Sequence, residues 1–209
     1  MSKSTGEQGS GDFKFHSGRP SLDLAATLGS RGFLDIERLR DETDLARWLC
    51  LAGLTGSSAQ ARPSDLRAAL ELREAIWRAV SADAEAPLPP AAVRVLNRWA
   101  GEPSLVPQIS ASRALSWQDP PALQDALSTI ARDAIFLLTG PSRMKIKQCA
   151  RAGCTILFVD ASRNGRRRWC SMDDCGNAVK GAAFVARRRE RGERSREASQ
   201  SDVHHHEAR

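Results

Sequence analysis

Four of the five cysteines lie close together near the C-terminal end of the chain. Cys149, Cys154, Cys170 and Cys175 form the pattern C-x4-C-x15-C-x4-C, in which two pairs are separated by enough chain for a β-hairpin. Structural zinc sites take four thiolate or imidazole ligands in a tetrahedron, and two local pairs complete that shell without a position for water. We therefore predict one structural Zn2+ ion bound by all four cysteines.

The rest of the composition favours metal binding over disulfides. No apolar run is long enough to cross a bilayer, and the opening MSKSTGEQGSGD does not resemble a signal sequence. We expect a cytoplasmic protein without membrane contacts, and in a reducing cytoplasm clustered cysteines more commonly bind metal. Cys50 has no His or Cys at a ligand-like spacing, so we expect it to pack as a small hydrophobic residue.

Positive charge is concentrated around the cysteines. Residues 143–197 hold 15 Lys or Arg and 6 Asp or Glu, a local balance of +9, although the whole chain carries only +6. This distribution is expected when one part of a protein contacts a polyanion. The predicted nucleic-acid contacts are Arg163, Arg166, Arg167 and Arg168 at a hairpin turn, and Lys180, Arg187 and Arg188, with Arg189 beside them, on the following helix. These residues can contact either phosphates or base edges, and the sequence does not distinguish the two.

The elements that position these side chains follow from local patterns. Residues 155–159 predict a strand, residues 160–165 a turn in which Asp160 and Ser162 bond backbone amides, and residues 166–169 a returning strand. After Cys175, apolar residues among basic ones predict a helix with a narrow apolar side. A knuckle, a β-hairpin and a helix that share one metal form a treble-clef-like finger.

The preceding part of the chain predicts a mainly helical α+β domain with short strands. Helical spacing of apolar residues indicates helices over 41–52, 63–82 and 93–100, a helix opened by Pro120 and Pro121, and a short helix at SLDLAATLG. Phe13 and Phe15 alternate with polar residues as in a strand, and residues 104–118 predict a hairpin. The tryptophans of the helices are expected in the core.

Two segments resemble known families. The run C-x4-C-x3-F-x-D-x-S-R-N-x-R-R-x-W-C-S-M-x-x-C-G-N, from Cys149 to Asn177, resembles the CGNR zinc finger. SLDLAATLG and the later D-L-A-R-W-L are similar to the ABATE domain that precedes this finger. The resemblance implies a stress-induced transcription regulator. It assigns residues 12–141 to an ABATE-like domain and residues 142–190 to a CGNR-type finger. Composition and charge separately predict a disordered leader (1–11) and a disordered basic, polar tail (191–209).

The chain departs from the family pattern at two places. Ala178 replaces the arginine of the CGNR signature, so Arg166 to Arg168 and the helix carry more of the predicted contact than the name implies. Ala25 and Ala26 stand where the ABATE domain usually has Val and Asn, which bears on any inherited ligand pocket.

We predict a DNA-binding transcription regulator whose zinc finger contacts DNA and whose N-terminal domain forms a homodimer and senses a small-molecule effector. The alternative is a zinc-finger module that binds protein or RNA without sequence-specific DNA binding. We do not expect an enzyme. The sequence has no phosphate-binding glycine loop, no H-E-x-x-H segment and no Cys and His arrangement for nucleophilic catalysis, and His16 is the only histidine outside the tail.

Overall fold

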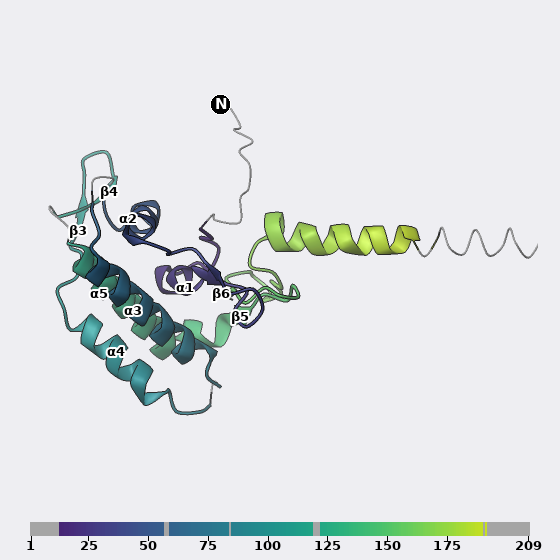
Figure 1. Ribbon diagram of the computed structural model, residues 1–209, viewed down its shortest axis with the longest axis horizontal. Coiled ribbons are helices and arrows are strands. Elements are labelled where there is room, and N and C mark those ends of the chain that lie inside the picture. Colours follow the sequence, from purple (N-terminus) through teal and green to yellow (C-terminus); the bar gives the residue numbers. More distant parts are fainter. Residues whose placement is uncertain (1–12, 57–58, 84, 119–121, 190, 192–209) are drawn as a thin grey trace, which may run out of the picture.

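A computed structural model describes residues 13–56, 59–83, 85–118, 122–189 and 191. The predicted leader, nearly all of the predicted tail and the Pro120-Pro121 helix start lie outside these residues. Three helices, α3 (Pro63–Ser81), α4 (Pro90–Ala100) and α5 (Leu123–Thr139), pack side by side (Figure 1). The short helix α1 (Pro20–Ala25) contacts α3 and α5, and α2 (Glu42–Leu51) contacts α3. The predicted α+β fold with a mainly helical N-terminal domain is confirmed.

The helices begin and bury their apolar faces for local reasons that the sequence shows. The Asp41 side chain accepts a hydrogen bond from the backbone N–H of Asp44, 2.8 Å away, which satisfies a free donor at the start of α2. Helix α3 has Pro63 in its first turn and buries Leu72 and Ile76 completely. Trp48 is 0% exposed and confirms the prediction that it anchors the core.

Among the described residues, three antiparallel strand pairs accompany the helices. They join β1 (Leu28–Gly29) to β2 (Ile36–Glu37), β3 (Pro107–Ile109) to β4 (Leu115–Trp117), and β5 (Ile146–Gln148) to β6 (Leu157–Val159). The β3–β4 pair confirms the hairpin predicted over 104–118. Over the part of the chain that the structure describes, none of the helices has both the length and the apolar character that a bilayer span requires.

Two predicted strands are wrong. Residues 13–16, where the described part of the chain begins, form no strand; instead, the rings of Phe13 and Phe15 pack edge to face, and Phe15 stacks on Trp48 with ring centroids 6.0 Å apart. Residues 166–169 do not return as a strand either, because β6 pairs with β5 and side chains satisfy the amides of this segment. The Arg167 N–H bonds Asp160 Oδ2 at 3.0 Å, and the Arg166 N–H bonds Ser162 Oγ at 3.1 Å.

The region with the four cysteines shares apolar contacts with the helical domain. Leu157 of β6 packs with Leu22 of α1 and Leu137 of α5 in one buried cluster. Ala26 packs in another buried cluster that contains three of the cysteines. Backbone bonds add to this contact, because the N–H of Val159 donates to the carbonyl of Ser17 at 3.0 Å. The two regions therefore pack through a common interior.

Candidate metal centre

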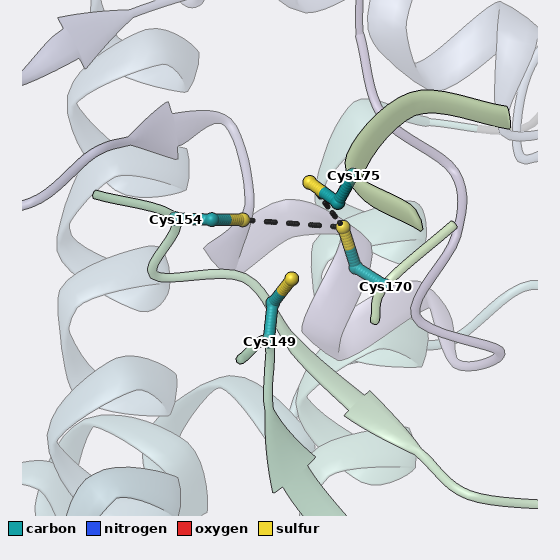
Figure 2. Close-up of side chains that lie close together, drawn as sticks. All are labelled: Cys149, Cys154, Cys170 and Cys175. Carbon is teal, nitrogen blue, oxygen red and sulfur yellow. Dashed lines mark hydrogen bonds between the residues drawn. The ribbon is translucent and has the colours of Figure 1, made fainter. Parts of the chain in front are cut away.

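The four cysteines come from two local elements. Cys149 follows β5 and Cys154 lies in the loop between β5 and β6, so the first pair forms a knuckle within one hairpin. Cys170 precedes the π-helical turn Met172–Gly176, which contains Cys175 and continues directly into a helix over 177–189. The Ser171 side chain accepts a hydrogen bond from the Asp174 N–H and caps this turn. The four sulfur atoms point toward one another (Figure 2).

The spacing of the sulfur atoms fits one tetrahedral metal ion. All four Sγ atoms lie within 4.8 Å of one another, with Cys154 Sγ 3.9 Å from Cys170 Sγ and Cys170 Sγ 3.5 Å from Cys175 Sγ. Zn–S bonds of about 2.3 Å in a tetrahedron place the sulfur atoms roughly 3.8 Å apart. Cys149, Cys154, Cys170 and Cys175 therefore suit a single structural zinc that ties the knuckle to the start of the last helix.

The thiols differ in how readily they ionise before metal binds. A hydrogen bond with Cys170 lowers the pKa of the Cys154 thiol to about 5. The same contact raises the pKa of Cys170, and burial raises the pKa of Cys175 to about 11. Because neighbouring thiolates repel one another, one ionised sulfur disfavours the next until a cation is present.

Charged side chains surround the cysteine cluster. Arg151 Nη1 donates a hydrogen bond to Cys175 Sγ at 3.8 Å, and this contact raises the pKa of the arginine. On the other side, Asp174 Oδ2 lies 3.0 Å from Lys14 Nζ and 3.3 Å from His16 Nε2. The ion pair with Lys14 holds the pKa of Asp174 below its usual value. The contact of Arg151 with Cys175 Sγ is the kind of outer contact that orients a ligand of a metal site.

Comparison with protein-family models assigns both regions. Residues 18–141 match the ABATE family, described as "Putative stress-induced transcription regulator". The chain belongs to the ABATE family. Residues 145–188 match the CGNR zinc finger, so the ABATE domain precedes the finger as the sequence patterns predicted. Both are regulatory or zinc-finger families rather than enzyme families, and the finger with its four converging cysteines carries one structural zinc site. No curated protein matches the chain.

The basic residues predicted from sequence fall into two groups. Arg163, Arg166 and Arg168 are exposed on the loop between β6 and Cys170, and Lys180, Arg187, Arg188 and Arg189 are exposed on the helix over 177–189. Arg167 instead turns inward. Its guanidinium donates to the carbonyls of Trp169, His16 and Cys170 and lies over the Phe158 ring.

Three residues near the CGNR zinc finger were not singled out from sequence. Arg151 lies two positions after Cys149, between the first two cysteines, and contacts Cys175. Its position in the sequence could have indicated a cation close to the metal ligands. Lys14 and His16 reach Asp174 from more than 150 positions away, and no local pattern indicates such a contact. Asp160 and Ser162 bond the turn amides as predicted, and a hydrogen bond with Lys147 also lowers the pKa of Asp160.

Proposed function

We propose that the zinc-loaded protein regulates transcription by binding duplex DNA through its CGNR zinc finger. The observation that supports this most directly is the helix over 177–189, which directly follows the turn that holds Cys175 and projects away from the helical domain (Figure 1). Its sequence has Lys180 and Arg187 to Arg189 and no acidic residue. At about 1.5 Å rise per residue the helix is roughly 20 Å long, and the major groove of DNA admits a helix.

The loop before Cys170 adds a second exposed set of cations. Arg163, Arg166 and Arg168 are exposed, and the side chains of Arg163 and Arg166 form no hydrogen bond or ion pair with any residue that the structure describes. Cations that are not engaged within the protein can bind phosphates and release counterions. Arg167 is excluded from this surface in our proposal, since its guanidinium already bonds three carbonyls.

Salt-dependent DNA binding tests the proposal. Fluorescence anisotropy with zinc-loaded protein, using promoter fragments from its own locus and random duplex, should show tighter binding to the promoter and a steep decrease of affinity with salt. Arg166→Gln and Lys180→Gln should each reduce the slope of log K against log salt by about 0.9 for every phosphate that the variant no longer neutralises. Arg94→Gln, which removes an exposed cation on α4, is the matched control. Equal affinity for all duplexes would exclude sequence-specific regulation.

A docking module for protein or RNA is the second candidate, and one observation favours it. The same helix exposes two adjacent large apolar side chains, Phe184 to 55% and Val185 to 49%, which a partner surface could cover. Phe184→Ser discriminates the two functions. DNA affinity should stay within about twofold under both functions, so partner binding decides: a protein partner that wild type binds and the variant does not supports the second function, and an unchanged set of bound proteins supports the first.

We also propose that the N-terminal domain forms a homodimer and responds to a small-molecule effector. Regulators that bind paired half-sites are commonly twofold symmetric. Ile109 and Leu115 face each other across β3 and β4 and are 80% and 66% exposed, so a second copy would bury them. Sedimentation of wild type and Ile109→Ser tests this: a dimer that the substitution dissociates supports the interface, and a monomeric wild type excludes the dimer.

A further inference from the structure

A cavity opens onto the metal centre from the side of the ABATE domain. Its volume is about 540 Å3, and Gly29, Ser30, Leu34 and Ile36 of the β1–β2 segment line it together with the knuckle. Three of the four predicted zinc ligands, Cys154, Cys170 and Cys175, also line it, but Cys149 does not. Since a water molecule occupies only about 30 Å3 of liquid, small polar molecules can enter a space of this size.

The cysteines are not equally protected from such molecules. Cys149, Cys170 and Cys175 are 5%, 1% and 4% exposed, whereas Cys154 is half-buried. Cys175 accepts a hydrogen bond from Arg151, which draws electron density from its sulfur. Cys154 is therefore the ligand most open to attack, and the sulfur of Cys170 lies 3.9 Å from it.

We propose that Cys154 is an oxidation site, and that hydrogen peroxide entering this cavity converts Cys154 and Cys170 into a disulfide and so releases the metal. The Cys154 thiolate attacks one peroxide oxygen, the O–O bond breaks, and sulfenic acid and hydroxide form. The Cys170 thiolate then attacks the Cys154 sulfur, the S–OH bond breaks, and a second hydroxide leaves as the S–S bond forms. Two sulfur atoms lose two electrons in total, and one peroxide gains them.

Loss of two ligands would remove the link that the metal makes between the knuckle and the helix over 177–189. Cys154 belongs to the knuckle and Cys170 to the segment that leads into that helix, so zinc no longer fixes how the helix projects. Peroxide would then be a chemical signal for this member of the ABATE family. An effect on DNA binding rests on the function proposed above, but oxidation and metal release do not.

The test uses zinc-loaded full-length protein and hydrogen peroxide, with zinc release followed by a chromogenic chelator and disulfides mapped by mass spectrometry. Cys50 on α2 is an internal control because it is half-buried like Cys154. We expect one zinc per chain to be released, a Cys154–Cys170 disulfide, and oxidation of Cys154 about tenfold faster than that of Cys50. Reduction by dithiothreitol should restore zinc binding.

Three results would overturn the proposal. They are retention of zinc while Cys50 is oxidised, equal rates at Cys50 and Cys154, and a first disulfide between Cys170 and Cys175. The variant Arg151→Gln provides a second test in which all four metal ligands are retained. Zinc should still load, and peroxide should oxidise Cys175 sooner than in wild type because its sulfur no longer accepts the hydrogen bond from Arg151. Neither measurement involves DNA, so failure of DNA binding and failure of the oxidation site are distinguishable.

Discussion

The guanidinium of Arg167 lies 4.3 Å from the centre of the Phe158 ring, which is fully buried. From that position it donates hydrogen bonds to the carbonyls of Trp169 and Cys170 in the finger and to that of His16, 2.8 Å away, in the N-terminal part of the chain. A cation that both stacks on a ring and bonds carbonyls is part of the interior of the finger, although it stands in the middle of a basic run.

Replacing Arg167 should therefore cost stability, whereas replacing its neighbour should not. Arg167→Met removes the carbonyl bonds and the ring contact, and we expect a decrease of about 2 kcal/mol in the free energy of unfolding. Arg166→Met is the matched control, with an expected change below about 0.5 kcal/mol because Arg166 is exposed. Urea unfolding of the zinc-loaded proteins measures both, and equal effects would contradict the role assigned to Arg167.

The ABATE domain and the finger should unfold together. Leu157→Ala opens a cavity in the cluster with Leu22 and Leu137, and we expect the free energy of unfolding to fall by about 2 to 4 kcal/mol. Circular dichroism of the helices and release of zinc should follow the same urea transition. Leu51→Ala is the control, because Leu51 is 60% exposed on α2. Two separate transitions would show that the shared cluster does not couple the regions.

Zinc affinity should rise steeply with pH. Cys175, with a thiol pKa of about 11, and Cys170, whose pKa is also raised, are protonated near neutral pH and must each release a proton when zinc binds. Cys154, with a pKa of about 5, is already ionised above pH 6. At least two released protons predict that apparent affinity increases at least about 100-fold per pH unit between pH 6 and 8. Chelator competition at several pH values checks this, and a slope near zero would exclude the assigned protonation states.

Asp23 should destabilise the fold as it ionises. Burial raises its pKa from 3.8 to about 6, so the folded protein binds this proton more tightly than the unfolded chain does. The stability that the protonated form contributes is complete below pH 4 and is lost as the pH rises through 6. Asp23→Asn carries no charge and retains an oxygen for the Ser17 N–H, 3.0 Å away in the wild type.

The variant should exceed wild type in unfolding free energy by about 3 kcal/mol at pH 7.5, and most of this difference should disappear near pH 4. Urea titrations at the two pH values measure it. Asp83→Asn, at an exposed carboxylate after α3, should change stability little at either pH. A gain of the same size at pH 4 would mean that ionisation is not its cause.

The parts of the structure that sequence predicted well have local causes. Helix α2 follows from a cap at Asp41 and apolar spacing, and the metal centre follows from two short cysteine pairs. The missed parts depend on distant partners. The strand expected at 166–169 does not form because β5 takes its place beside β6, and the inward turn of Arg167 depends on Phe158 and on a carbonyl at His16. Charge alone could not separate Arg167 from the exposed arginines around it.

Arg151 has a consequence for the net charge of the metal centre. A zinc ion with four thiolates is formally a dianion, which by itself would repel any polyanion that approached the start of the last helix. The guanidinium of Arg151 lies against Cys175 at that point, 3.8 Å from its sulfur, and offsets part of this charge where the helix begins. The knuckle therefore supplies two of the four metal ligands, Cys149 and Cys154. It also supplies the cation Arg151, which offsets part of the negative charge of the metal centre.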